Sequence, residues 1–219
     1  KKLSQEAFSL TAYYDSVISE YLCIDNNNYF TQKKTLHGNL VEVLRYGENP
    51  HQKSAIYSKN NNLSISQLSG KKLSYNNYND IFSALLISKS LPKDTGTVII
   101  KHANPCGVSI DKDKIKSYKS ALNCDPISAF GGIVAFNFKI NKKLALELNK
   151  IFLEVVIGNE IDIDALKILK RKKNLRIIDI SNYKFKNINS IRSFDGSFLI
   201  QSKNELIFDR KKLRCVTKI

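Results

Sequence analysis

Short apolar runs alternate with amphipathic stretches along most of the chain. Runs of mainly β-branched and other apolar residues have the length of buried strands, and they lie at 97–100, 133–136, 153–157 and 175–180. Stretches with apolar residues three and four positions apart have the pattern of amphipathic helices, and they lie at 80–89, 114–122, 141–152 and 162–173. Strands that alternate with helices are typical of layered sheets whose strands are partly parallel. The pattern therefore predicts an α/β fold, a layered sheet with helices.

The two ends of the chain follow a different pattern. Residues 5–22 have the apolar spacing of a helix with Ser4 as its N-cap, and no partner for this helix is evident nearby. A polar stretch rich in Asn begins at about Asp25 and continues to about Gly38, and we interpret it as a linker. Near the other end, the Asp195-Gly196 dipeptide between two strand-like runs predicts a β-hairpin over 191–201.

The first of three polar loops lies between the strand-like pieces 41–43 and 55–57. It carries Arg45, Tyr46, His51 and other polar residues, together with a Gly and a Pro. Arginine is the usual bidentate partner of phosphate, and binding residues concentrate on rigid loops. The loop therefore predicts a binding site for an anionic ligand, and a turn with chance polar residues is the alternative.

The second loop follows the strand-like run 97–100. It begins with Lys101 and His102 and continues through Asn104-Pro105-Cys106-Gly107, where we expect a sharp turn. Pro disfavours helix in the residue before it, and Gly107 can adopt a φ angle that other residues avoid. A cation and an imidazole at the carboxyl end of a strand lie where open α/β sheets hold their chemistry. The alternative is a strand that ends in two solvated polar residues.

The third loop, 125–132, ends in a pair of glycines directly before an apolar strand. Such a pair permits a close approach of the backbone to another group, and a strand entry that needs a flexible backbone is the alternative. A further polar stretch, Gly70 to Asn77, precedes the predicted helix 80–89, for which Asn79 or Asp80 is the expected N-cap.

Composition narrows the classes of function. The formal net charge of +15 invites a nucleic-acid-binding function, but the lysines are spread along the chain, and the densest cluster, 170–173, ends a predicted helix. A phosphorylated small substrate suits this charge better. No apolar run approaches the roughly 20 residues of a membrane span. The four cysteines form no C-x-x-C pair, which argues against a zinc cluster and for reduced thiols in the cytoplasm.

The chain contains no methionine, and we interpret it as an internal fragment of a longer protein. A fragment leaves a surface without its partner. We therefore expect apolar residues near Phe130, Val155 and Ile157 to be exposed beside a bare strand edge.

The motifs R-Y-G-E-N-P-H-Q, K-H-A-N-P-C-G-V and D-P-I-S-A-F-G-G-I-V-A-F-N occur in this order. Together they resemble the AICAR transformylase part of the family of bifunctional AICAR transformylase/IMP cyclohydrolases. The resemblance runs from about Leu44 to the segment L-R-C-V-T-K, and A-F-S-L-T-A-Y-Y-D-S-V-I-S-E-Y-L resembles the last helix of the cyclohydrolase domain. It implies that 1–38 holds this helix and a linker, and that 39–219 holds an incomplete first half of the transformylase domain.

The resemblance also implies a fold and a reaction. The fold is a cytidine-deaminase-like subdomain without catalytic zinc. The reaction is formyl transfer from 10-formyltetrahydrofolate to the 5-amino group of AICAR in purine (IMP) biosynthesis. Catalysis falls to Lys101, as a source of positive charge or a proton, and to His102, as the base. The residues that the resemblance places around the substrate are Arg45, Tyr46, Asn77, Phe130, Gly131 and Glu154.

Partners follow from the same resemblance. It implies a cytoplasmic homodimer with 10-formyltetrahydrofolate as co-substrate and no metal, nucleic acid or membrane. The cyclohydrolase site lies outside this chain, and the fragment is expected to be inactive alone. Two alternatives stay open, a relative of nucleoside deaminases and a basic nucleic-acid-binding domain. The first is weakened because no second Cys follows Cys106 at the spacing of the zinc deaminases and no Glu follows His102.

Overall fold

The computed structural model describes residues 1–25, 30–184, 189–202, 204 and 214–217. Its main body is a six-stranded sheet with the strand order β3-β8-β7-β6-β4-β5. The strands of this sheet are β3 (Ser66–Ser69), β4 (Gly96–Lys101), β5 (Asn104–Ile110), β6 (Ile133–Phe136), β7 (Val155–Gly158) and β8 (Arg176–Asp179). The helices that accompany it are α2 (Tyr75–Ser90), α3 (Lys114–Cys124), α4 (Pro126–Ala129), α5 (Lys142–Leu148) and α6 (Ile163–Leu169).

The sheet is mixed, as the alternation of apolar and amphipathic stretches predicts. Strands β6, β7 and β8 are parallel, and α5 and α6 connect them in sequence. Strand β4 pairs antiparallel with both β6 and β5, and β3 pairs antiparallel with β8. Every residue of β6 and β7 is buried, which is typical of strands covered on both faces. The predicted α/β layered fold is confirmed.

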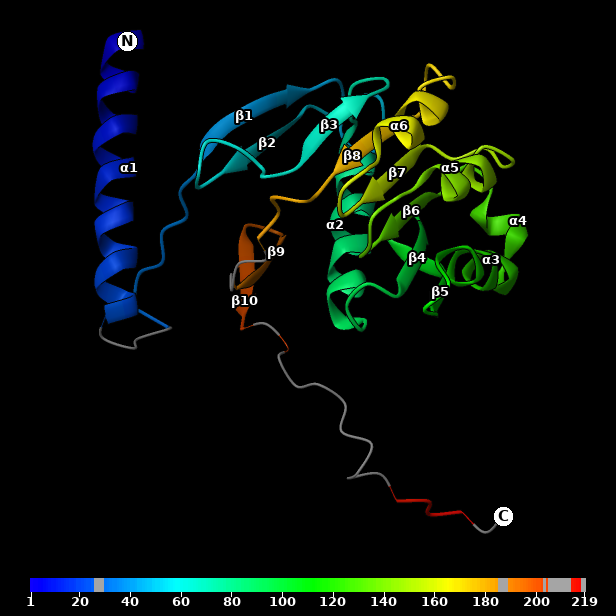
Figure 1. Cartoon of the computed structure of the whole chain (residues 1–219). Helices are drawn as coiled ribbons and strands as arrows, with labels where there is room; N and C mark the ends of the chain where they lie inside the picture. The colour runs from blue at the N-terminus through cyan, green and yellow to red at the C-terminus, as the bar shows by residue number, and fades with distance from the viewer. Residues whose placement is uncertain (26–29, 185–188, 203, 205–213, 218–219) are drawn as a thin grey trace.

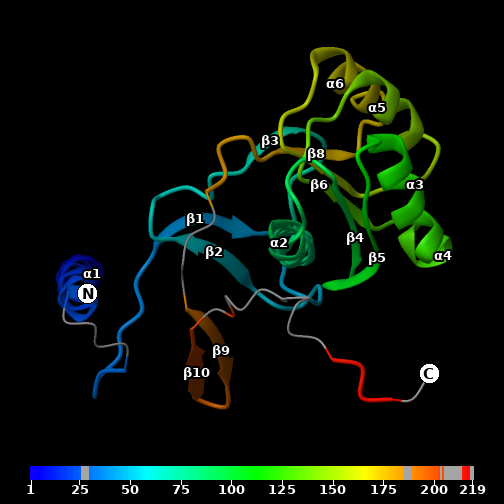
Figure 2. The same ribbon diagram turned by 60° about the horizontal axis from the view of Figure 1, so that its bottom comes forward.

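Helices cover both faces of the sheet (Figures 1 and 2). On one face, Ile99, Val134 and Val156 belong to a core that includes residues of α3, α5 and α6. On the other face, Val98, Ala135 and the neighbouring strand residues pack with α2. Side chains of successive strand residues alternate between these two cores, since they point to opposite faces of a sheet.

Helix α2 begins earlier than the sequence predicts. Its N-cap is Ser74, whose hydroxyl accepts from the amide of Asn77 while the Asn77 side chain accepts from the Ser74 amide. This reciprocal capping box fixes the helix start at Tyr75. The prediction that Asn79 or Asp80 caps the helix is therefore wrong, since both lie inside it. Helices α5 and α6 are shorter than predicted.

The turn after β4 also differs from the prediction. Residues Asn104 to Gly107, expected to form a turn, belong to β5, and the turn consists of His102 and Ala103. Pro105 is tolerated there because β5 is an edge strand and its pairing register shifts near this residue. The conformational reason given to Gly107 is wrong as well. Its φ is not positive, and a Cβ at this position would lie 2.0 Å from the carbonyl oxygen of Ala121 in α3.

Smaller elements accompany the sheet on the side where β3 lies (Figure 1). They are helix α1 (Lys2–Asp25), the antiparallel pair β1 (Asn39–Leu44) and β2 (Ser54–Ser58), and the hairpin β9 (Ser190–Phe194) and β10 (Ser197–Gln201). The hairpin and the strands around the first polar loop are confirmed. Ser4 lies inside α1, so its predicted capping role is wrong. Residues 26–29, within the predicted polar linker after this helix, fall outside the described part of the chain.

Helix α1 has a partner, contrary to the sequence expectation. The hydroxyl of Ser16 lies 2.8 Å from Thr35 Oγ1 and 3.0 Å from His37 Nδ1, and Glu20 forms an ion pair with Lys59 in the turn after β2. The hydrophobic pattern carries no signal for these contacts because they join polar side chains far apart in the chain.

None of the described helices is both long and apolar enough to cross a membrane.

The expected bare strand edge is absent at β7. Val155 and Ile157 are fully buried, because β7 lies in the interior of the sheet between β6 and β8. Phe130, in contrast, is 58% exposed. The part of that expectation that concerns Val155 and Ile157 is therefore wrong.

Candidate active site

A cavity of about 620 Å³ lies where the carboxyl end of β4 meets the amino ends of β6, β7 and β8. Seven of the eight residues predicted from the sequence line it, namely Tyr46, Asn77, Lys101, His102, Phe130, Gly131 and Glu154. The eighth, Arg45, is exposed and does not line the cavity. Lys101 is the last residue of β4, and His102 follows it directly. Because β4 runs antiparallel to β6, however, the site is at the amino ends of the parallel strands.

Lys101 is hydrogen-bonded to the third polar loop. Its Nζ donates to the carbonyl oxygen of Phe130 at 2.6 Å. Gly131 has a φ of +72°, and a Cβ at this position would lie 3.5 Å from the Phe152 ring and 3.9 Å from Lys101 Nζ. These are ordinary van der Waals distances, so the position favours glycine for its left-handed backbone and not for lack of space. One donor of this ammonium is used by the carbonyl, and the group lines the cavity.

Glu154 forms the centre of a polar network on the other side of the cavity. Its Oε2 accepts from Asn77 Nδ2 at 3.1 Å and lies 3.7 Å from Arg176 Nη1. Arg176 also donates from Nε to the carbonyl oxygen of Lys72. Asn77 is 4% exposed, and its side-chain oxygen caps α2. The amide of Asn77 is thus bonded at both ends within the protein, so it orients Glu154.

The loop that carries Tyr46 is organised by its own backbone. The Gly47 amide donates to the carbonyl of Gln52 at 2.9 Å, and the Asn49 amide donates to Gln52 Oε1 at 2.7 Å. Asn76 Nδ2 bonds the carbonyl of Glu48 and joins the loop to α2. Arg45 lies over the ring of Tyr46, with its guanidinium carbon 5.5 Å from the ring centroid. The loop is therefore a preformed wall of the cavity.

Two aromatic rings border the cavity. The centroids of Phe130 and Phe152 are 5.4 Å apart, and the rings are 58% and 50% exposed as residues. The backbone joins the two loops, since the Gly131 amide donates to the carbonyl of Phe152 at 2.9 Å. Large apolar side chains with this exposure offer a stacking surface for a flat ligand.

Sequence reasoning assigned no role in the site to the other nine lining residues. They are Lys71, Ser74, Asn76, Asp80, Ile133, Phe152, Leu153, Asn174 and Arg176. Most of them lie within a few positions of a predicted site residue in the sequence. Polar residues at the helix and strand starts next to the polar loops could therefore have been included. Arg176 is the second residue of the predicted strand 175–180, and an arginine at the start of an apolar run is a usable signal. Arg176 lies at the start of β8 and Lys101 at the end of β4, far apart in the sequence. The distance between them along the chain therefore could not predict that Arg176 belongs to the site.

Asp80 and the cysteine of the second loop differ from typical solvent-exposed groups. Burial raises the pKa of the Asp80 carboxyl above its usual range, against the opposing effect of the hydrogen bond from the Ala103 amide. Burial likewise raises the pKa of the Cys106 thiol, which keeps it protonated at neutral pH.

Among the residues that the structure describes, no group of three His, Cys, Asp or Glu side chains is arranged to hold a metal ion.

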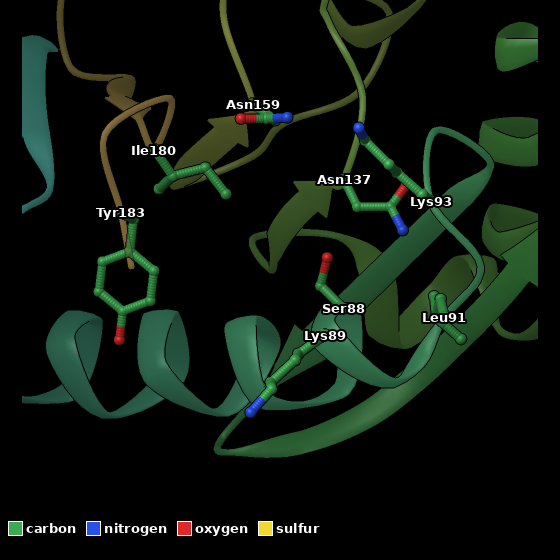
Figure 3. A pocket seen from close by; sticks show the side chains of 8 residues that line it. All are labelled: Ser88, Lys89, Leu91, Lys93, Asn137, Asn159, Ile180 and Tyr183. Atoms are coloured by element: carbon green, nitrogen blue, oxygen red, sulfur yellow. The ribbon is translucent and has the colours of Figure 1, made fainter. Parts of the chain in front are cut away.

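A second, smaller cavity of about 270 Å³ lies at the carboxyl ends of the parallel strands (Figure 3). Asn137 follows β6, Asn159 follows β7 and Ser88 comes from α2. The Asn137 side chain accepts from the Gly96 amide and donates to the carbonyl of Pro92. It therefore joins the end of β6 to the segment that leads into β4. This cavity contains none of the residues predicted from the sequence.

The larger cavity combines groups of complementary chemistry. Its cations are Lys71, Lys101 and Arg176, its carboxylates are Asp80 and Glu154, and its imidazole is His102. An imidazole next to an ammonium group can move a proton while the cation stabilises negative charge that develops on a reacting oxygen. The aromatic border and the additional cations suit a flat, anionic substrate.

Comparisons with known proteins find one family. The family model described as "AICARFT/IMPCHase bienzyme" matches residues 1–219. The chain is 42% identical, over 99% of its length, to the "Bifunctional purine biosynthesis protein PurH" of Petrotoga mobilis, 44% of which is covered. The proteins of the same name from Thermoanaerobacter sp. and Caulobacter vibrioides are 41% and 38% identical, over 99% and 100% of this chain and 43% of each relative. The chain thus spans less than half the length of these relatives.

Proposed function

The chain belongs to the AICARFT/IMPCHase bienzyme family, and from this premise we propose that its large cavity belongs to a site of formyl transfer. The donor is 10-formyltetrahydrofolate and the acceptor is the 5-amino group of AICAR, a phosphoribosylated aminoimidazole carboxamide. One observation carries the proposal. The end of β4 brings Lys101 and His102 into the same cavity as Tyr46, Gly131 and Glu154, which come from three other segments of the chain.

The proposed reaction needs a base and a positive charge. The amine of AICAR is conjugated with its ring and is a weak nucleophile, so a base must accept its proton as the new C–N bond forms. We assign this proton to His102. The formyl oxygen becomes negative in the tetrahedral intermediate, and the Lys101 ammonium stabilises it. The bond from the formyl carbon to the folate nitrogen then breaks, and that nitrogen takes up the proton.

The hydrogen-bond network around Glu154 supports a substrate-binding role for the side of the cavity that lies across from Lys101. Asn77 and Arg176 fix the carboxylate from two sides, so that it can accept hydrogen bonds from amide or hydroxyl groups of the substrate. Lys71 and Arg176 supply positive charge for a phosphate. Phe130 and Phe152 provide the apolar surface for the rings. Arg45 lies outside the cavity but over the ring of Tyr46, and we assign it to nucleotide binding together with that tyrosine.

The division of the chain is also a proposal. Residues 1–38 are assigned to the end of a cyclohydrolase domain and a linker, and 39–219 to the first part of a transformylase domain with a cytidine-deaminase-like subdomain. The change of architecture at β1, where a single helix gives way to sheet, supports this boundary. We assign no cyclohydrolase residue to this chain, and formyl transfer is a property of the longer cytoplasmic protein, without a metal.

Hydrogen exchange in the presence of AICAR tests the proposal. In the full-length protein, saturating AICAR should protect amides of the loops around Tyr46, Lys101 and Gly131, because the ligand covers these segments. The amides of β9 and β10, which contribute no residue to the cavity, serve as the internal control.

The same experiment separates the enzyme from the nucleic-acid-binding alternative that the net charge of +15 favours. An oligonucleotide should leave these loops unprotected at physiological salt. Protection by an oligonucleotide that weakens as salt is raised, with no effect of AICAR, would contradict the proposed function.

A further inference from the structure

The turn that carries His102 has an unfavourable backbone conformation. Lys101 pairs with Asn104 across the hairpin, so His102 and Ala103 are the two residues of the loop. Their φ angles are +50° and +59°, as in the hairpin turns that normally contain Asn-Gly. Both residues have a Cβ, and the left-handed conformation is disfavoured for such residues. Something outside the turn must therefore stabilise it.

Asp80 makes the hydrogen bond that does so. Its Oδ1 accepts from the backbone amide of Ala103 at 2.7 Å, and the His102 amide stabilises the same carboxylate electrostatically. Within the hairpin itself, Asn104 Nδ2 adds a bond to the carbonyl of His102 at 2.8 Å. Without Asp80, the partly buried Ala103 amide would lose this acceptor.

The position of Asp80 is itself well fixed. It lies in the second turn of α2, after the capping box of Ser74 and Asn77. The residues that follow, Ile81, Ala84 and Leu85, are almost completely buried against the sheet. A carboxylate on such a helix is a rigid acceptor.

The His102 ring has no comparable support. Among the hydrogen bonds of the described residues, none involves its imidazole, and the residue is exposed at the cavity wall. Its position in the cavity therefore depends on the backbone of the turn. A displacement of that backbone by about an ångström is enough to cost a large part of the rate, up to roughly 100-fold in known cases.

We propose that Asp80 is a positioning residue, which holds the His102–Ala103 turn in its left-handed conformation through the backbone amides and so places the imidazole in the cavity. The effect of Asp80 on catalysis rests on the proposed function. Its effect on the backbone of the turn does not. The competing role for Asp80 is electrostatic, as a negative charge near the imidazole.

Three variants of the full-length protein distinguish these roles. Asp80→Asn keeps an acceptor oxygen for the amides but removes the charge. Asp80→Ala removes both. In the double variant with Asp80→Ala and Ala103→Gly, the acceptor is absent, but glycine adopts a positive φ without a penalty.

For each variant we would measure kcat, the KM for AICAR and the exchange rate of the Ala103 amide. Asp80→Ala should lower kcat about 10-fold or more and leave the KM for AICAR within about threefold. The Ala103 amide should exchange about 10-fold faster or more, because its acceptor is gone. Asp80→Asn should stay within about threefold of the wild type in kcat, and Ala103→Gly should restore most of the kcat lost in Asp80→Ala.

Equal losses of kcat in Asp80→Asn and Asp80→Ala would assign the role to the charge and overturn the inference. An unchanged exchange rate of the Ala103 amide in Asp80→Ala would overturn it as well, whether or not the protein is active. If the wild type transfers no formyl group, the proposed function fails, and the exchange rates of these variants still decide whether Asp80 clamps the turn.

Discussion

At the scale of single residues, the fold holds the two proposed catalytic side chains in different ways. Lys101 is fixed at its ammonium group by the Phe130 carbonyl, whereas His102 depends on the backbone of its turn. Both could be predicted from the sequence as a pair at the end of a strand. Asp80 could not, because its role comes from a turn whose location at 102–103 is visible only once β5 is known to be a strand.

His102 provides the first prediction. In the full-length protein, His102→Ala should lower kcat for formyl transfer roughly 100-fold, the scale of a lost general base, with little change in the KM for AICAR. His51→Ala is the matched control, since His51 is exposed in the loop of Tyr46 and does not line the cavity. A steady-state assay of both variants checks this. Equal rates for His102→Ala and His51→Ala would exclude His102 from the chemistry.

At the scale of elements, the sequence predicted which elements exist better than where they begin. The buried runs of β4, β6 and β7 are unmistakable because both faces are apolar. The start of α2 and the existence of β5 were missed for physical reasons that can be named. A capping box at Ser74 and Asn77 outweighs the isolated acidic residue at Asp80, and an edge strand accepts a proline that a central strand would exclude. Gly107 was singled out correctly but for the wrong reason.

Gly107 gives a prediction on the packing of β5 against α3. Gly107→Ala should destabilise the protein by about 3 kcal/mol or more, because its Cβ would meet the backbone carbonyl of Ala121 at 2.0 Å. Gly196→Ala is the control. Its Cβ meets nothing within 4 Å, and the positive φ alone costs about 1 kcal/mol. Urea unfolding measures both, and equal losses would show that β5 and α3 do not pack so closely.

Tyr118 gives a prediction on the core. The residue is 2% exposed, and its hydroxyl has no hydrogen-bond partner among the described residues. Burial, aided by the charge of Glu147, raises the pKa of Tyr118 to about 12. Tyr118→Phe should therefore leave stability at neutral pH unchanged or increase it by about 1 kcal/mol, since it removes a buried unpaired group.

The pH dependence of the same variant has a definite sign. Above pH 10 an unfolded tyrosine ionises, whereas folded Tyr118 stays neutral until about pH 12. The wild type thus loses stability as the pH rises through this window, and Tyr118→Phe should lose less. Tyr57→Phe, at a residue 62% exposed, should behave as the wild type. A wild type and a Tyr118→Phe variant with parallel stability curves from pH 9 to pH 11 would contradict the buried, neutral phenol.

At the scale of the whole molecule, the site is an assembly of segments that sequence spacing does not bring together. Tyr46 comes from the β1–β2 loop, Lys101 from the end of β4 and Glu154 from the residue directly before β7. They meet because β4 is inserted antiparallel beside β6, which places its carboxyl end among the amino ends of the parallel strands. The sequence predicted the loops and the residue types. It could not predict the direction of β4, on which the cavity depends.

The most direct measurement is the rate at which the full-length protein releases tetrahydrofolate from 10-formyltetrahydrofolate, with and without AICAR. We predict release that depends on AICAR, saturates with it and is nearly abolished by His102→Ala. A wild-type protein that folds and dimerises but releases no tetrahydrofolate in the presence of AICAR would contradict the assignment of this cavity to formyl transfer.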